Sequence, residues 1–232
     1  TSDGSRGIYR TQFDTAEGKL SAAELIIEVD NPSYLALSED SRYLYAVSEG
    51  GRSEGSALNA YRYDAAKDSF TPISRKATYG ASPCYVALHG GYAYTANYTG
   101  GSLTRFQIAE DGSLGEGVEQ KYEPKEGQRS HVHGIFVAPD AKSIYVTDLG
   151  RSEIYQIEGD KELSRTALPA GVGPRHMAFS KDGRVAYALC ELSGTVSVFD
   201  IEPQGLRLKQ TIASDSVGGG GCADIHLSPD GG

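Results

Sequence analysis

Tryptophan is missing from this chain of 232 residues, and methionine occurs once. Cysteine is also scarce: Cys84, Cys190 and Cys222 form an odd set without CxxC spacing, which argues against a disulfide framework or a zinc site. Such a set is typical of buried thiols in a reducing compartment. No apolar run is long enough to cross a bilayer, and the first residues do not resemble a signal peptide. We therefore expect a cytoplasmic protein.

Positive charge is in the minority, with 22 Lys and Arg against 31 Asp and Glu, for a formal net charge of −9. Binding to nucleic acid or to an anionic membrane needs a basic face, so we expect neither as a partner. An anionic ligand would have to be held by a local cluster of arginine and histidine.

Glycine and tyrosine are abundant, with 29 and 15 copies, a composition that favours strands joined by tight turns over a helical bundle. One pattern recurs along the chain: a polar lead-in, an apolar strand, a turn and a second strand rich in tyrosine. With Tyr34, Tyr85, His133, His176 and Asp224 taken as equivalent, the copies lie 51, 48, 43 and 48 residues apart. That period is typical of β-propeller blades.

Each repeat also contains two further strand-like stretches, such as LTRFQIA and GVEQKYE, so four strands make up one unit. Turns such as EDGS and SKDGR supply the Asp and Gly that tight hairpins require. We therefore predict an all-β fold, a β-propeller of four-stranded antiparallel blades whose first strands line a central channel. The expected single domain, 1–232, contains about four to five blades: a partial blade at 1–31, blades near 32–81, 82–129, 130–172 and 173–215, and the first strand of a further blade at 222–232.

Two histidines, His131 and His133, precede and begin the first strand of one repeat. Because successive side chains on a strand point to opposite faces, these two should point the same way. A lone histidine of this kind more commonly bonds a neighbouring blade than acts in catalysis. Here the following repeats place Arg175, His176 and Asp224 at corresponding positions. Polar residues at one level of adjacent blades are expected to converge on a pocket.

The second strand of each repeat ends in a polar residue as well: Glu49, Asn97, Asp148 and Glu191. We predict that Asn97 and Asp148 contact substrate. The alternative for both, and for Glu49, is a structural role in which the side chain satisfies backbone donors at a turn. Glu191 is the stronger functional candidate, because a hairpin would bring it next to Arg175.

The motifs ANYTGG, HVH, GPRH and ADIHLSPDG, in this order along nearly the whole chain, resemble the lactonase family of seven-bladed β-propellers. The resemblance implies hydrolysis of 6-phosphogluconolactone to 6-phosphogluconate in the pentose phosphate pathway, with a small anionic sugar lactone as the partner. The family pattern continues beyond LSPDG with about two more blades. We therefore expect these 232 residues to form an incomplete ring.

The chain also resembles the fungal carboxymuconate-lactonizing enzymes, which share the fold and in which a histidine, an arginine and a glutamate are implicated. By motif position these would be His133 or His131, Arg175 and Glu191. The resemblance thus implies His133, Arg175 and Glu191 as catalytic residues. The predicted substrate-binding residues are His131, His176, Asn97, Asp148 and Asp224.

Lactone hydrolysis needs an activated water, stabilisation of a tetrahedral oxyanion and a grip on the anionic end of the substrate. Glu191 or His133 could accept the proton of the water. Arg175 could bind the oxyanion or the phosphate through its planar donor fork. His131 and His176 would orient the substrate or donate to the developing negative oxygen. We expect no cofactor and no metal, because a His-x-His pair alone is not a compact ligand motif.

Two other functions stay open at this point. The chain could open or close a different lactone, such as a muconolactone, with the same residues. It could instead be a non-enzymatic propeller that binds a ligand or a protein at its mouth, since a fold alone does not define a function. That interpretation gains support if Arg175 and Glu191 face away from the channel. The sequence does not give the oligomeric state.

Overall fold

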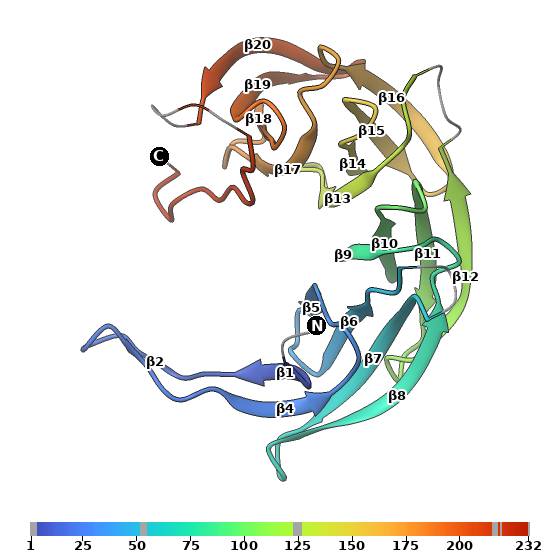
Figure 1. Ribbon diagram of the computed structural model, residues 1–232, viewed down its shortest axis with the longest axis vertical. Helices are drawn as coiled ribbons and strands as arrows, with labels where there is room; N and C mark the ends of the chain where they lie inside the picture. The colour runs from blue at the N-terminus through green and yellow to red at the C-terminus, as the bar shows by residue number, and fades with distance from the viewer. Residues whose placement is uncertain (1–3, 52–54, 123–126, 215–217, 219, 232) are drawn as a thin grey trace.

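The computed structural model describes residues 4–51, 55–122, 127–214, 218 and 220–231. Every regular element in these ranges is a β-strand, which confirms the predicted all-β class. None of the described segments forms a helix that could cross a membrane. Figure 1 shows the strands arranged as the blades of an open ring, viewed along its axis. The predicted partial propeller is therefore confirmed.

Four sheets of four antiparallel strands make up most of the ring, and within each sheet the strands are ordered as they occur in the chain. The first strand of each sheet lies on the inside of the ring and the last on the outside (Figure 1). We name the sheets blade A, with β5 (Leu35–Leu37), β6 (Tyr43–Ser48), β7 (Ala57–Asp64) and β8 (Ser69–Ala77); blade B, with β9 (Pro83–His89), β10 (Tyr92–Asn97), β11 (Ser102–Ile108) and β12 (Leu114–Lys121); blade C, with β13 (Val132–Val137), β14 (Ile144–Asp148), β15 (Glu153–Glu158) and β16 (Lys161–Ala167); and blade D, with β17 (Pro174–Phe179), β18 (Val185–Cys190), β19 (Thr195–Glu202) and β20 (Gly205–Ala213).

A smaller sheet precedes blade A, in which β1 (Gly7–Arg10) pairs with β4 (Glu24–Glu28). The hairpin of β2 (Phe13–Asp14) and β3 (Lys19–Leu20) projects from this sheet (Figure 1). At the other end, the predicted strand at 222–232 is not formed within the described residues 222–231. A strand needs a hydrogen-bonded neighbour, and no described strand pairs with this segment.

The hydrophobic core lies between adjacent blades. One cluster joins blades B and C and includes Tyr94, Ile135 and Tyr155. Another joins blades C and D and includes Tyr145 and Phe199. Full burial of such a side chain stabilises the fold by about 1.5–3 kcal/mol. Packing between adjacent blades therefore holds the open ring together.

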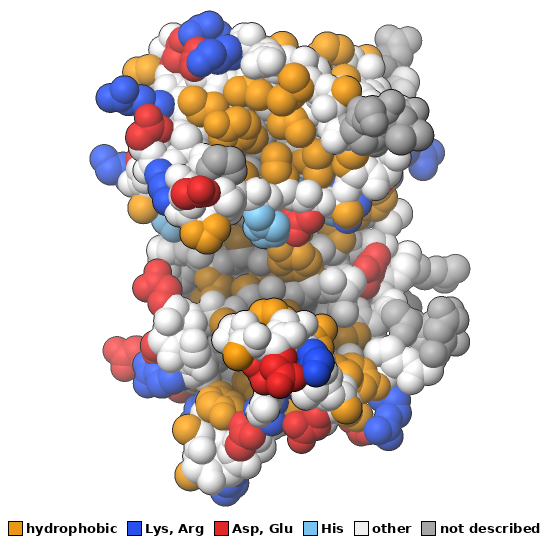
Figure 2. Space-filling view, turned by 90° about the vertical axis from the view of Figure 1, so that its left-hand side faces the viewer, with side chains coloured by type: hydrophobic (Ala, Val, Ile, Leu, Met, Phe, Trp, Pro, Cys, Tyr) orange, Lys and Arg blue, Asp and Glu red, His pale blue; other side chains and the backbone are white. Residues whose placement is uncertain are grey.

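The open side of the ring exposes hydrophobic side chains. Figure 2 looks at this side and shows them gathered on its upper half, which is formed by blade D. Exposed hydrophobic side chains of this blade include Leu192, Leu208 and Ile212. Within the described residues, no neighbouring blade covers this face as blade C covers the opposite one.

A β-bulge stands near the start of the inner strand in blades B, C and D. The additional residue is Cys84 in β9, His133 in β13 and Arg175 in β17. A bulge leaves its extra residue out of the ladder and re-aims the side chain. In register, His133 therefore corresponds to Cys84 and Arg175, and not to Tyr85 and His176 as the repeat alignment assumed. That alignment was wrong by one residue in blade C.

Candidate functional site

The antiparallel pairing of the first two strands of each blade places the predicted residues along one rim of the ring. Pro83 pairs with Asn97, and Pro174 pairs with Cys190. The start of each inner strand therefore lies beside the end of the second strand. Glu191, which follows Cys190, comes close to the bulge residue of β17 for this reason.

Arg175 and Glu191 form an ion pair at this rim. The Nη1 of Arg175 lies 2.6 Å from the Oε2 of Glu191, and each side chain is 26% exposed. The Nε of Arg175 is buried, and no described residue accepts a hydrogen bond from it. The guanidinium is thus anchored through one nitrogen and retains donors for a ligand. The two residues lie together, as expected if both belong to the site of a lactone-hydrolysing enzyme.

His133 is nearly buried beside this pair, with 8% of the residue exposed. Its ring centroid lies 5.4 Å from that of His176 and 5.7 Å from that of Tyr98. Burial, followed by the positive charge of Arg175 and the neighbouring His176, lowers the pKa of His133 to about 3. The ring is therefore neutral near pH 7 and a weak proton acceptor. This disfavours His133 as the predicted base, although a neutral imidazole can still donate a hydrogen bond.

The Nδ1 of His133 has no hydrogen-bond partner in the part of the chain that the structure describes. A buried polar atom without a partner is uncommon in folded proteins. Its presence at the rim, next to the unpartnered Nε of Arg175, indicates a place where a ligand or water completes the hydrogen bonding.

His176 is paired with Asp224, a contact that the sequence analysis did not predict. The Nδ1 of His176 lies 2.7 Å from the Oδ1 of Asp224. The other carboxylate oxygen lies 2.9 Å from the Nε2 of His226. Partial burial opposes ionisation of Asp224, but the hydrogen bonds with the two histidines outweigh it and lower its pKa to about 2. Burial lowers the pKa of His176, and the hydrogen bond with Asp224 offsets part of this effect.

His131 lies at the same rim, in contact with Tyr98. The two rings stack with their centroids 4.6 Å apart. The Nδ1 of His131 is 3.1 Å from the backbone oxygen of Tyr98, so it is this nitrogen that carries the hydrogen and donates it. His131 and His133 thus contact one tyrosine, although His133 is the bulge residue of β13.

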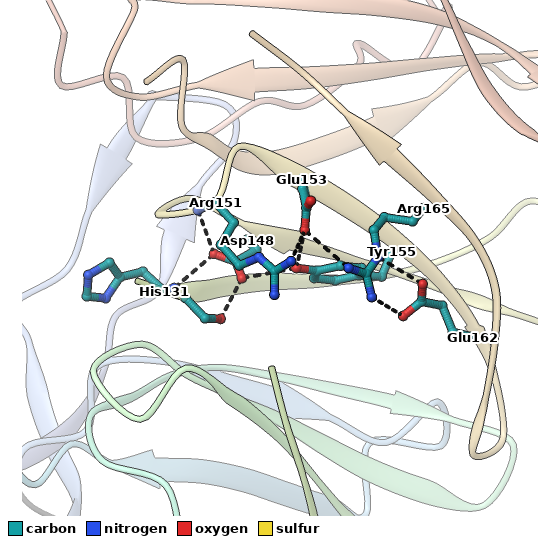
Figure 3. A network of polar contacts seen from close by, with 8 residues as sticks. His131, Asp148, Arg151, Glu153, Tyr155, Glu162 and Arg165 are labelled. Atoms are coloured by element: carbon teal, nitrogen blue, oxygen red, sulfur yellow. Dashed lines mark hydrogen bonds and ion pairs between the residues drawn. The ribbon is translucent and has the colours of Figure 1, made fainter. Parts of the chain in front are cut away.

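Asp148 is inside blade C. It is fully buried, and its carboxylate accepts hydrogen bonds from the hydroxyl of Ser130 at 2.5 Å and from the backbone N–H of His131 at 2.9 Å (Figure 3). The backbone N–H of Arg151 donates to it as well, and the hydroxyl of Tyr155 lies 3.2 Å from it. These contacts within the blade favour the structural alternative for Asp148, and its contact with substrate stays a prediction.

Asn97 is also fully buried. Its Nδ2 donates to the hydroxyl of Ser102 at 3.0 Å and to the hydroxyl of Thr104 at 2.9 Å. Both acceptors are on β11, the next strand of blade B. These hydrogen bonds favour the structural alternative for Asn97 as well, and its contact with substrate stays a prediction.

Sequence reasoning missed the aromatic residues that surround the histidines. Tyr34 and Tyr85 stack with centroids 4.1 Å apart, and the ring of Tyr85 meets that of His176 edge-on at 5.3 Å. Both tyrosines stand at the repeat positions that were aligned with the histidines, so the alignment contained the signal. Tyr98 belongs to the ANYTGG motif, so the sequence pattern pointed to this tyrosine as well.

The same aromatic side chains line the channel between the inner strands. A cavity of about 410 Å³ in this channel is lined by Tyr34, Tyr85, Ile135, Phe136 and Met177 among others. The side chains that line it are aliphatic or aromatic. Within the described residues, no group of three or more His, Cys, Asp and Glu side chains is arranged to hold a metal ion. That no metal or cofactor is needed stays a prediction.

The sequence model of one protein family, lactonases that form a seven-bladed β-propeller, matches residues 1–232. The 6-phosphogluconolactonase of Bacillus subtilis is 28% identical over 247 residues, which cover 100% of this chain and 70% of the relative. These matches agree with the predicted resemblance to lactone-hydrolysing enzymes.

Solved structures agree as well. A Bacteroides fragilis protein assigned as a 6-phosphogluconolactonase superposes with a TM-score of 0.90 at 35% identity, covering 100% of this chain and 70% of that one. A periplasmic gluconolactonase of Pseudomonas aeruginosa gives a TM-score of 0.91 at 32% identity, with 100% and 71% covered.

Proposed function

This chain belongs to the lactonase family of seven-bladed β-propellers, and on that premise we propose that it hydrolyses 6-phosphogluconolactone to 6-phosphogluconate. The names of the Bacillus and Bacteroides relatives support this substrate. A role in the pentose phosphate pathway and residence in the cytoplasm are parts of the same proposal.

The observation that carries the proposal is the convergence of Arg175, Glu191, His133 and His176 on one rim. Arg175 is close enough to lower the pKa of His133. Burial, and after it the negative charge of Glu191, raises the pKa of Tyr98, and Arg175 opposes this rise. All these groups therefore surround one place. Because Arg175 and Glu191 face the same site, a non-enzymatic propeller has less support.

Each group at the rim suits a step of lactone hydrolysis. The remaining donors of Arg175 can bind a phosphate or an oxyanion through charge-assisted hydrogen bonds. Neutral His133 can donate to the carbonyl oxygen as negative charge develops on it. Glu191 holds the guanidinium in place through Nη1. In a chain with a net charge of −9, this local positive charge is what can hold an anionic substrate.

A second candidate is hydrolysis of an unphosphorylated sugar lactone. The likeness to the periplasmic gluconolactonase of Pseudomonas aeruginosa favours it. The two candidates share the ester chemistry and differ in whether a phosphate is bound. In the second, Arg175 would act on the oxyanion alone.

The test is a lactonase assay of the full-length protein with both lactones, corrected for spontaneous hydrolysis. A hydrogen bond to a charged group contributes about 1.5–3 kcal/mol, so kcat/KM should be about 10- to 100-fold higher for the phosphorylated lactone. Equal values would favour the second candidate. No acceleration of either reaction would overturn the proposed function.

A further inference from the structure

The ring of His176 is held by aromatic side chains on several sides. Tyr34 and Tyr85 meet it edge-on, with centroids at 6.3 and 5.3 Å. Phe136 and His133 follow at 5.7 and 5.4 Å. The residue is 5% exposed, so the ring has little freedom to turn. A catalytic side chain needs a fixed orientation of this kind.

Asp224 determines which ring nitrogen carries the hydrogen. An ionised carboxylate only accepts hydrogen bonds, so the Nδ1 of His176, at 2.7 Å, must donate to it. The Nε2 then has a lone pair. No described residue is hydrogen-bonded to Nε2, and Nε2 is not among the buried polar atoms that lack a partner, so this nitrogen is not fully buried and can meet a water.

We propose that His176 is the general base of the lactonase site, that Asp224 is its positioning residue, and that the Nε2 of His176 takes the proton of the attacking water. This inference rests on the proposed function and assigns a residue within it. His133 lacks a carboxylate partner, and Glu191 is engaged with Arg175. Only the proton taken up by His176 would lie beside a carboxylate that stabilises it.

The reaction conserves atoms and electrons. Nε2 accepts a proton from water, and the water oxygen forms a bond to the lactone carbonyl carbon while the π electrons move to the carbonyl oxygen. The oxyanion then reforms the double bond and the bond to the ring oxygen breaks. The imidazolium returns its proton to that oxygen, which becomes a hydroxyl. The new carboxylic acid ionises and releases its proton to solvent.

The groups that face His176 set the pH dependence. They are Tyr34, Tyr85, Phe136, His133, Arg175, Asp224 and His226. Burial lowers the pKa of His176, and Arg175 and His226 lower it further, whereas Asp224 raises it. The neutral ring is the active form. Activity should therefore fall as the pH falls through the pKa of His176.

The first experiment replaces the base and supplies it again in solution. In the full-length protein, His176→Ala should lower kcat for the lactone by about 10²- to 10⁴-fold, and added imidazole should restore part of the loss. A residue with a purely structural role would not be rescued. A variant with the kcat of the wild type, or one that is folded and inactive without rescue, would overturn the inference.

The second experiment removes the carboxylate. Asp224→Asn should lower kcat by up to about 10⁴-fold with little change in KM, and it should move the acid limb of the kcat profile to lower pH because Asp224 raises the pKa of His176. Asp230→Asn removes the same charge from the same segment and should change neither quantity. An unmoved acid limb in Asp224→Asn would contradict the positioning role.

A third measurement needs no substitution. In the wild-type protein, ¹⁵N NMR of the histidine rings should show His176 with its hydrogen on Nδ1 at neutral pH, and the opposite tautomer would overturn the inference. Lactone turnover by the wild type separates the two claims. An inactive wild type refutes the proposed function, whereas an active wild type with active His176→Ala refutes only the assignment of the base.

Discussion

Two polar regions of the molecule differ in how deeply their ion pairs are buried and in what surrounds their atoms. In blade C, the carboxylate of Glu153 accepts a hydrogen bond from the hydroxyl of Tyr155 at 2.8 Å and pairs with Arg151 at 2.9 Å (Figure 3). The side chains of this ion pair are 3% and 4% exposed. At the rim, by contrast, Arg175 and His133 each have a buried nitrogen without a partner among the described residues.

The difference separates a structural network from a candidate site. A buried carboxylate whose acceptors are used within the protein holds one conformation and has nothing to offer a ligand. A polar group that faces an opening without a partner can be completed by one. The missing partner is insufficient alone, because the hydroxyl of Tyr122 also lacks one in the described chain. That tyrosine stacks on Tyr155 within the core.

The two regions are joined through Asp148. Its carboxylate fixes Ser130 and the backbone of His131, which lead into β13. Figure 3 shows the ring of His131 pointing away from the network. Thr147, next to Asp148, donates a hydrogen bond to the backbone oxygen of Arg175 at 2.6 Å. The blade C network thus helps to position the backbone that carries His131 and Arg175.

The largest expected effect is on stability, from Glu153→Gln. This change removes the charge of Glu153 from its buried pair with Arg151, and breaking a buried pair costs about 3–5 kcal/mol. Urea unfolding should show that loss, while kcat of the folded fraction stays near that of the wild type. Glu162→Gln is the matched control, because Glu162 pairs with Arg165 where both side chains are over 30% exposed. Its cost should stay below about 1 kcal/mol. Similar losses in both variants would remove the distinction between the two regions.

The opposite pattern is expected for Arg175→Lys. Lysine keeps the charge but not the planar donor fork, so kcat/KM should fall about 100-fold, comparable to removal of one oxyanion donor. Unfolding free energy should change by less than about 1 kcal/mol, since both side chains of the pair are partly exposed. Arg184→Lys, at a side chain that is 85% exposed, serves as the control. Wild-type kinetics in Arg175→Lys would show that the arginine is structural.

The blades and their rim could be predicted because repetition reveals them. A period of 43 to 51 residues with alternating apolar positions constrains the fold far more than any single strand does. The same repetition placed Arg175, His176, Glu191 and Asp224 at one edge before any contact was known. Antiparallel pairing is enough to bring strand starts and strand ends together.

The role of each polar side chain could not be predicted in the same way. Asn97, Asp148 and Glu191 all end or follow a second strand, yet the first two point into their blades and the third reaches Arg175. A polar residue at a strand end looks the same in the sequence whether its side chain points into the blade or towards the rim. The bulge at His133 is equally hidden, because one extra residue leaves no mark on a repeat whose length already varies.

The smallest expected effect concerns the acid sensitivity that an unsatisfied rim should cause. His133 has a folded-state pKa of about 3, below the value of about 6.5 expected for the unfolded chain. Below pH 6.5 the unfolded chain binds a proton that the folded protein does not. Protonation of His133 therefore favours the unfolded chain, so the stability that the neutral ring allows is fully present at pH 7 and is lost as the pH falls. The slope is about 1.4 kcal/mol per pH unit, which amounts to about 2 kcal/mol between pH 7 and pH 5.

Urea unfolding at both pH values should show that His133→Asn loses about 2 kcal/mol less than the wild type, whereas His89→Asn, at the far end of β9, should lose as much as the wild type. An equal loss in the wild type and His133→Asn would mean that the rim accommodates a charged His133, and the contrast with the blade C network would then rest on Arg175 alone.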